Sequence, residues 1–277
     1  MSGHCGPTRD RAHERYSVLG IRIAAVDYDS TVETIIDAAR ARQSISVSAL
    51  AVHGVMTGAL DPVHRFRLNH LDLLVPDGQP VRWALGWLHR VHVADRVYGP
   101  LLMLKLCERA AAEGIPIFLF GGSARLLAAL CDRLTRRIPG LAIAGVKASH
   151  FRRLTAEEQW GLVETIRTSG AGLMFIGLGC PRQEVCAFEL QAHLSLPLVA
   201  VGAAFNFHAG LLPQAPPAMQ KAGLEWLYRL VQEPQRLWRR YLLLNPLYLV
   251  LVLLQRIGLG RFDPDRALAP IESLRYG

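Results

Sequence analysis

Short apolar runs rich in β-branched residues alternate with amphipathic stretches of helical length between about residues 20 and 210. This alternation is typical of βαβ units around a parallel sheet. Several runs are hydrophobic throughout, as expected of strands covered on both faces. We therefore predict an α/β fold, with a Rossmann-like, mostly parallel sheet flanked by helices. The predicted strands cover residues 21–26, 44–49, 71–75, 115–120, 141–146, 172–176 and 196–201.

Three predicted helices begin at recognisable capping residues. Ser30 is followed three positions later by Glu33, and Thr155 by Glu158, which is the spacing of a capping box. Ser123 follows Gly122 at the end of an apolar run and is expected to open another helix.

The pattern changes after about residue 212. Pro213, Pro216 and Pro217 interrupt the chain, and the segments that follow show helical patterning without strand signals. The predicted organisation is a disordered tail at 1–15, an α/β domain at 16–212 and a helical appendage with a tail at 213–277. The longest apolar run, 241–254, is shorter than the roughly 20 residues that span a bilayer.

The distribution of charge indicates where in the cell the protein is expected. The chain has 277 residues, of which 51% are hydrophobic and 19% charged, so a disordered protein is excluded. Its net charge is +8, and residues 221–261 hold seven basic against two acidic residues beside the apolar run. We expect the appendage to dock on an anionic membrane surface. Residues 1–15 lack a signal-like apolar stretch and five cysteines are irregularly spaced, so a cytoplasmic protein at the inner face of the cell membrane is expected.

Residues that directly follow the predicted strands are the first candidates for chemistry, because open parallel sheets bind ligands there. Asp77, in Pro76-Asp77-Gly78, is either a turn aspartate or a general base. Gly121 and Gly122 lead into a helix start, which suits either a phosphate or a tightly packed turn.

Two further strand ends are ambiguous. Gly177-Leu178-Gly179 begins like a dinucleotide fingerprint, but Arg182 stands where the last glycine is needed. Asn206 and His208 follow another strand, and a single histidine of this kind is more often structural. Cys180 is expected to be inert, because no histidine follows it at a position that would indicate a partner for a nucleophilic thiol.

The Asp-x-Asp triplets at 27–29 and 263–265 lack further ligands nearby, so no metal site and no cofactor are predicted.

Six segments together resemble the WecG/TagA/CpsF family of bacterial glycosyltransferases over roughly residues 20–245. The segments are 76–78, 95–99, 120–122, 177–184, 202–205 and 223–230. The resemblance implies an inverting, metal-independent transfer of an N-acetylmannosamine-type sugar, its uronic acid or glucose. The donor would be a UDP-sugar and the acceptor a polyprenyl-diphosphate-linked saccharide, in surface polysaccharide or exopolysaccharide synthesis.

The resemblance also implies roles for individual residues. Asp77 matches the proposed general base, and Arg96 matches the arginine proposed to hold the donor diphosphate. Gln183 and Glu184 match a polar pair beside the nucleotide. The other expected substrate-binding residues are Ser48, Gly78, Gln79, Gly121, Gly122, Gly177, Gly179 and Asn206. Arg229, Arg236, Arg239 and Arg240 are expected on the membrane or acceptor side.

Two positions depart from the family pattern. Leu50 stands where the family has Asn after an early strand, which leaves the role of Ser48 and the donor sugar open. Asn206 stands where Asp is common in the family. This removes one carboxylate that could compete with Asp77 for the role of base.

Two other classes of protein compete with the transferase. One is a nucleotide-cofactor enzyme on a Rossmann-like sheet, which the incomplete glycine fingerprint disfavours. The other is a non-catalytic, membrane-associated scaffold. Nucleic-acid binding is not expected, because the basic residues cluster beside an aliphatic segment rather than among surface aromatic residues. The sequence leaves open whether the protein forms a homo-oligomer.

Overall fold

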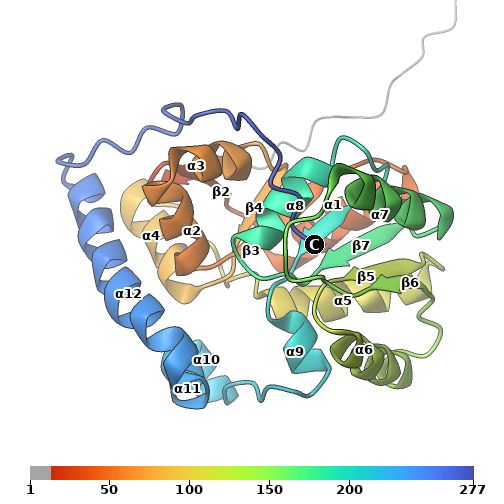
Figure 1. Ribbon diagram of the computed structural model, residues 1–277. Coiled ribbons are helices and arrows are strands. Elements are labelled where there is room, and N and C mark those ends of the chain that lie inside the picture. The colour runs from red at the N-terminus through yellow and green to blue at the C-terminus, as the bar shows by residue number, and fades with distance from the viewer. Residues whose placement is uncertain (1–13) are drawn as a thin grey trace, which may run out of the picture.

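The computed structural model describes residues 14–277, without the side chains of Pro217, Lys221, Arg236, Arg239 and Arg240. The predicted disordered tail therefore lies almost wholly outside the described residues. Figure 1 shows a central sheet between layers of helices, with the last helices along one side.

Six parallel strands form the central sheet, in the order β4-β3-β8-β7-β5-β6. They are β3 (Ser46–Leu50), β4 (Leu73–Pro76), β5 (Ile117–Phe120), β6 (Ile143–Lys147), β7 (Leu173–Ile176) and β8 (Leu198–Ala200). All five neighbouring pairs are parallel, which confirms the predicted α/β class. Each of the seven predicted runs contains a strand, and six of these strands form this sheet.

Both faces of the sheet are covered, and alternate strand residues point to opposite faces. On one side, residues such as Ile117 and Leu119 pack against α1 (Tyr28–Arg40), α5 (Gly99–Ala112), α6 (Ala124–Arg137) and α9 (Ala204–His208). Phe118 and Phe120 pack on the other side. The helices of that side are α2 (Val52–Leu60), α3 (Pro62–Asn69), α4 (Gln79–His89), α7 (Ala156–Thr168) and α8 (Arg182–Leu190).

The predicted strand at 21–26 is not part of the parallel sheet. β2 (Ile21–Ala24) pairs antiparallel with β1 (Arg15–Val18) in a separate two-stranded sheet. Leu19 and Gly20 both adopt positive φ, 52° and 83°, and this two-residue turn reverses the chain. Placing Arg15 in the disordered tail was also wrong, because it begins β1.

The helix starts are largely as predicted. Thr155 and Glu158 form the capping box of α7, and Ser123 caps α6. The expected box at Ser30 was wrong: Asp27 is the N-cap of α1, and its carboxylate accepts hydrogen bonds from the backbone and the hydroxyl of Ser30. An acidic side chain can satisfy free N–H groups and face the positive end of the helix dipole, so it serves well as the cap.

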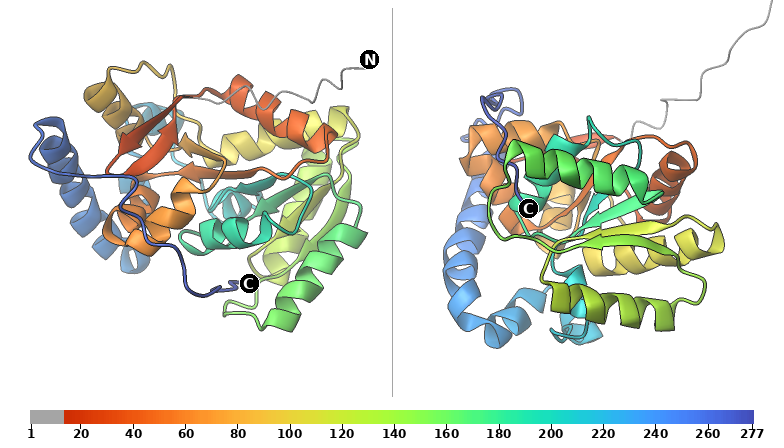
Figure 2. Two further views of the ribbon diagram at one scale, coloured as in Figure 1. Left: turned by 90° about the horizontal axis from the view of Figure 1, so that it is seen from above. Right: turned by 45° about the vertical axis from the view of Figure 1, so that its right-hand side comes forward.

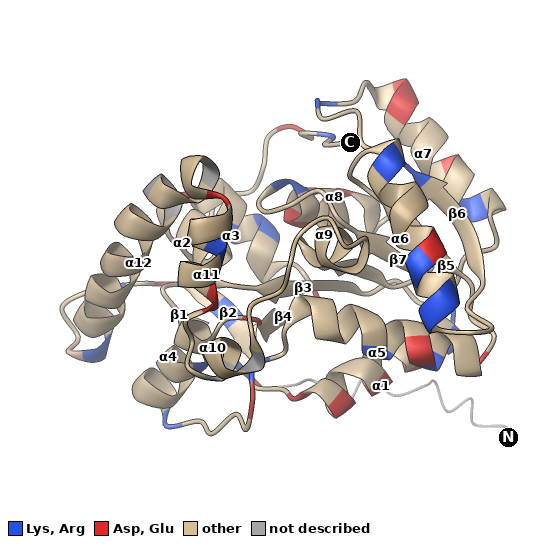
Figure 3. Ribbon diagram, turned by 90° about the horizontal axis from the view of Figure 1, so that it is seen from below, with Lys and Arg blue, Asp and Glu red and all other residues tan. Residues whose placement is uncertain are grey.

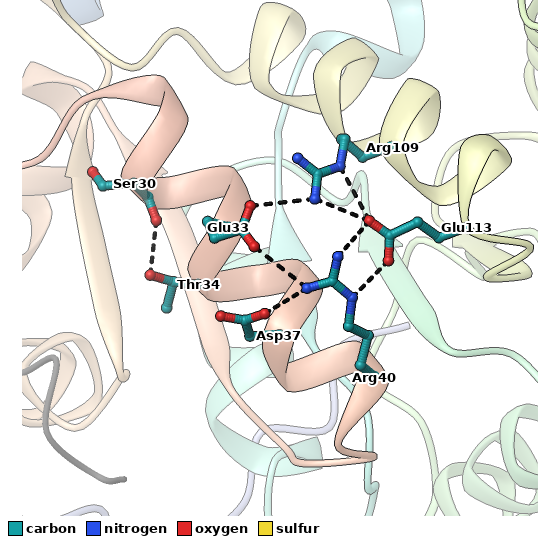
Figure 4. Close-up of polar contacts among 7 residues, drawn as sticks. All are labelled: Ser30, Glu33, Thr34, Asp37, Arg40, Arg109 and Glu113. Carbon is teal, nitrogen blue, oxygen red and sulfur yellow. Dashed lines mark hydrogen bonds and ion pairs between the residues drawn. The ribbon is translucent and has the colours of Figure 1, made fainter.

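A cluster of ion pairs joins α1 to α5 on the surface (Figure 4). Glu113 lies 2.6 Å from Arg40 and 2.9 Å from Arg109. Glu33 and Asp37 complete the cluster through further contacts with the same two arginines. Glu113 comes directly after α5, so the cluster fixes the far ends of these two helices.

The C-terminal part of the chain contains three helices and then a returning tail. They are α10 (Pro217–Lys221), α11 (Glu225–Gln232) and α12 (Pro234–Arg256). Tyr248 and Val252 of α12 are buried in the same core as one face of the sheet, and the Tyr248 hydroxyl donates to the backbone of Pro80. Residues 257–277 then cross back over the molecule, and Glu189 accepts hydrogen bonds from the backbone of Leu274 and Arg275.

The outer side of α12 is apolar and exposed. Leu243, Leu249, Val250 and Leu253 are all more than half exposed. The middle of the helix carries no charged residue (Figure 3). None of the helices among the described residues is both long and apolar enough to cross a membrane.

Candidate active site

The carboxyl ends of β3 and β4 bring two chain segments together at one edge of the sheet. The backbone N–H of Asp77, directly after β4, donates to the carbonyl of Leu50 at the end of β3. Gly99 packs against the same point, where a Cβ would lie 3.2 Å from the Val201 carbonyl and 3.5 Å from Asp77 Oδ2. The absence of a side chain at Gly99 thus lets three segments converge around one carboxylate.

Asp77 has the electrostatics of a general base. Loss of water around its carboxylate raises the pKa of Asp77 to about 7, and the negative charge of Glu225 adds to the rise. The positive charges of Arg96 and Arg229 and a hydrogen bond from the Gly99 backbone oppose it. A carboxylate with a pKa near 7 is available at neutral pH and binds a proton more strongly than an ordinary aspartate.

Arg96 lies beside Asp77 and is paired with the appendage. Its Nη2 is 2.6 Å from Glu225 Oε2, and the two side chains are only 10% and 12% exposed. Its Nη1 donates to the backbone carbonyl of Asp77 at 3.4 Å, and its guanidinium carbon lies 4.4 Å from the centre of the Tyr98 ring. The guanidinium is therefore held in a fixed position near the base.

Two clefts meet at Asp77. The first, of about 160 Å³, extends toward Trp226, Tyr241 and Asn245 of the appendage. The second, of about 290 Å³, extends along the ends of β7 and β8 and includes Gly179, Gln183 and Gly202. The walls of both clefts include Ala51, His53, Asp77, Tyr98 and Arg229.

The predicted polar pair forms part of the second cleft. Gln183 donates to Glu184 at 2.8 Å and accepts from the backbone of Gly179 at 3.2 Å. The Ser48 hydroxyl donates to Glu184 at 3.0 Å. Burial raises the pKa of Glu184. Ser48 itself lines neither cleft, so the structure places it behind Glu184 as a support.

The predicted glycines and Gln79 divide into residues that line a cleft and residues that do not. Gly78 and Gln79 line the first cleft and Gly179 lines the second. Gly121 and Gly177 instead allow close packing: a Cβ on Gly121 would lie 2.7 Å from the backbone of Gly177, and one on Gly177 would lie 2.5 Å from Phe205. Gly122, at φ 68°, forms the turn into α6. These last three line neither cleft.

Of the remaining predicted residues, some line the clefts and others do not. Asn206 lies on α9 and lines neither cleft, although the neighbouring Phe207 lines the second. Arg229 of α11 reaches both clefts, and its guanidinium lies 5.7 Å from the centre of the Phe207 ring. The side chains of Arg236, Arg239 and Arg240 lie outside the described residues.

Sequence reasoning missed several residues of the site. Glu225 and Trp226 were noted only as part of a family motif, and their positions against Arg96 and in the first cleft depend on how α11 folds back. Tyr98 was missed as a wall of both clefts; its backbone N–H donates to the hydroxyl of Tyr28. His53, two residues beyond Ala51, was missed although it follows a predicted strand end, which is the signal that identified Asp77.

The structure locates Asp27, Asp29 and Cys180, which the sequence raised as candidates for metal or thiol chemistry. Asp27 is engaged as a helix cap, and Asp29 lies 3.8 Å from Lys105. No group of three or more His, Cys, Asp or Glu suited to a metal occurs within residues 14–277. Burial raises the pKa of the Cys180 thiol well above its usual value, which disfavours the reactive thiolate.

Two clefts that meet at a carboxylate on a parallel sheet suit an enzyme that joins a donor to an acceptor. Residues 16–261 match the family model of the Glycosyl transferase WecG/TagA/CpsF family. The chain belongs to this family and is a glycosyltransferase. The family acts in cell-surface polysaccharide synthesis, generally with a nucleotide-sugar donor and a lipid-linked acceptor.

Proposed function

We propose that this enzyme transfers a sugar from a UDP donor to a polyprenyl-diphosphate-linked saccharide, with inversion at the anomeric carbon. The transferred sugar is of the N-acetylmannosamine type, its uronic acid or glucose. The product belongs to a bacterial surface polysaccharide or exopolysaccharide.

The position of Asp77 carries this proposal. Its carboxylate stands where the two clefts meet and has a raised pKa of about 7. It takes the proton from the acceptor hydroxyl as that oxygen attacks the anomeric carbon and the UDP–sugar bond breaks on the opposite face. A single displacement of this kind inverts the anomeric configuration.

The two arginines near Asp77 suit the leaving group. Negative charge builds on the diphosphate as the bond to the sugar breaks, and nearby guanidinium groups stabilise that charge. Arg96 and Arg229 both line the first cleft, and Arg229 also lines the second. We propose that these two groups and the backbone donors at the strand ends replace a divalent metal ion, so transfer continues in EDTA.

The two clefts are suited to different substrates. The second contains the strand-end loops of β7 and β8 with Gly179 and Gly202, which allow close backbone approach, and we assign it to the nucleoside of the donor. The donor diphosphate then lies at the junction of the clefts, where Arg229 lines both and Arg96 lines the first. The first is bordered by the appendage residues Trp226, Tyr241 and Leu244, and we assign it to the acceptor. The lipid-linked end of the acceptor then lies toward α12.

The surface of α12 supports docking on a membrane. Within the apolar run 241–254, Tyr248 is not available for docking, because its side chain is buried against the core. Leu242, Leu243, Leu249 and Val250 are exposed, and Trp83 and Trp87 of α4 are exposed as well. Exposed tryptophans beside an aliphatic surface are common where a protein meets the lipid headgroups. Shallow, reversible docking is the proposed role.

The direct test is transfer itself. The purified full chain is incubated with a panel of UDP-sugars and a short polyprenyl-diphosphate-linked acceptor, with and without EDTA. Released UDP, product mass and the anomeric configuration by NMR are measured. We expect one donor to be preferred, an inverted product and unchanged activity in EDTA. Absence of transfer from every UDP-sugar would overturn the donor assignment, and a retained configuration would overturn the single displacement.

Docking is tested with anionic and neutral vesicles in a sedimentation assay. The double substitution Leu249→Glu with Val250→Glu should reduce binding to anionic vesicles at least tenfold. The matched control, Ile271→Glu, changes an exposed residue of the tail and should leave binding unchanged. If the double variant sediments like the wild type, α12 is not the docking surface.

A further inference from the structure

His53 lies at the same junction as Asp77. It occupies the first turn of α2, directly after the end of β3, and lines both clefts. Gly54 lets the helix begin this close to the site: a Cβ there would lie 2.4 Å from Leu50 Cδ1 and 3.6 Å from Cys180 Sγ. The backbone carbonyl of His53 accepts from Thr57, which further fixes the start of the helix.

The His53 ring has one enclosed nitrogen and one open nitrogen. Nδ1 is buried and has no hydrogen-bond partner within the described part of the chain. A proton on Nδ1 would be a buried donor without an acceptor, which is costly, so the ring proton stays on Nε2. Nε2 is not among the buried atoms without a partner, so it is the ring nitrogen that a ligand can reach, and the residue lines both clefts.

An unpartnered nitrogen alone would not indicate a substrate contact. His64 on α3 also has a buried ring nitrogen without a partner, yet it lines neither cleft. His53 differs because it lines both the donor and the acceptor cleft, three residues after β3, the strand that pairs with β4, and Asp77 directly follows β4.

We propose that His53 is a substrate-contacting residue that donates a hydrogen bond from Nε2 to an oxygen atom of a reacting sugar. This contact holds the sugar against Asp77 so that the attacking hydroxyl and the anomeric carbon are aligned. The diphosphate is not its partner, because Arg96 and Arg229 already supply charged donors for that group. The inference rests on the proposed transfer reaction.

Three substitutions of His53 test which nitrogen of its ring donates the hydrogen bond to the sugar. A glutamine amide nitrogen can reach the place of Nε2, whereas an asparagine amide nitrogen corresponds to Nδ1. We expect His53→Ala and His53→Asn to lower kcat/KM for sugar transfer about 10- to 100-fold, the usual effect of one lost hydrogen bond to substrate. His53→Gln should recover activity to within about fivefold of wild type by the same argument. UDP affinity should stay within twofold in all three variants.

Several outcomes would overturn the proposal. They are full activity in His53→Ala, equal rescue by Asn and Gln, or a tenfold loss of UDP affinity, which would move the contact to the diphosphate. His92→Gln, at an exposed histidine that lines neither cleft, is the matched control and should behave as wild type. If His53→Ala does not fold, the comparison of Gln with Asn still decides. Absence of transfer by the wild type would contradict the proposed function instead.

Discussion

The molecule contains two ion-pair sites of similar chemistry in very different surroundings. At the surface, Arg40 and Arg109 hold Glu113 between α1 and α5, and the arginine side chains are 44% and 40% exposed. At the active site, Arg96 and Glu225 are 10% and 12% exposed and lie beside Asp77. Water screens the first site, and the second site is largely shielded from it.

This difference determines what each site can do. The surface cluster lowers the pKa of Glu113, but it lies away from the clefts and acts only on the packing of two helices. In the buried site, each charge reaches Asp77: Arg96 lowers its pKa and Glu225 raises it. The buried pair therefore adjusts the base, and one member of it comes from the appendage.

Removal of Arg96 should have the largest effect within this comparison. Arg96→Ala is expected to weaken UDP binding and to slow transfer about 10²- to 10³-fold, because it removes a charged donor to the diphosphate. The pKa of Asp77 should rise above about 7, since Arg96 lowers it, and the acid side of the pH–rate profile should move to higher pH. Titration calorimetry with UDP and the rate profile measure both effects. Unchanged UDP affinity with weaker acceptor binding would place Arg96 on the acceptor side.

Substitution of Glu225 should shift the profile in the opposite direction. In Glu225→Gln the charge that raises the pKa of Asp77 is lost, so the acid side of the profile should move to lower pH. The variant should also lose about 1–3 kcal/mol of unfolding free energy, because the Arg96 guanidinium loses its charged partner. Denaturant unfolding and the rate profile are the measurements. A shift to higher pH would contradict the electrostatic role given to Glu225.

The matched change in the surface cluster should do least. Glu113→Gln is expected to lower the melting temperature by less than about 3 °C, because exposed ion pairs contribute little. The acid side of the pH–rate profile should not move. A profile shift as large as that of Glu225→Gln would mean that the surface cluster also acts on Asp77.

Much of the fold was predictable because local patterns decide it. Buried strands such as Leu173–Ile176 are apolar throughout, and caps such as Thr155 and Ser123 mark helix starts directly. The hairpin of β1 and β2 was not predicted, since Leu19 and Gly20 are not a typical hairpin turn pair and Arg15–Val18 is a mixed polar segment. Pro246 lies inside α12, and the helix continues through this proline because Tyr248 and Val252 pack into the core.

The site was predictable in part for a related reason. Asp77, Gln183 and Glu184 follow strands, and the topology of a parallel sheet brings strand ends together. The partnership of Arg96 with Glu225 joins residues 129 positions apart and depends on the return of α11. Gly121 and Gly177 were expected at the substrate, but their role is close packing, which no local pattern separates from phosphate binding.

The most direct test of Asp77 as the base compares Asp77→Asn with the wild type for both transfer and UDP binding. The wild-type rate should fall on the acid side with a midpoint near pH 7, because protonation of the carboxylate removes the base. Asp77→Asn should lose about 10²- to 10⁴-fold in transfer at every pH while UDP affinity stays within a few-fold, since the base acts on the acceptor. Undiminished turnover by Asp77→Asn would contradict the account.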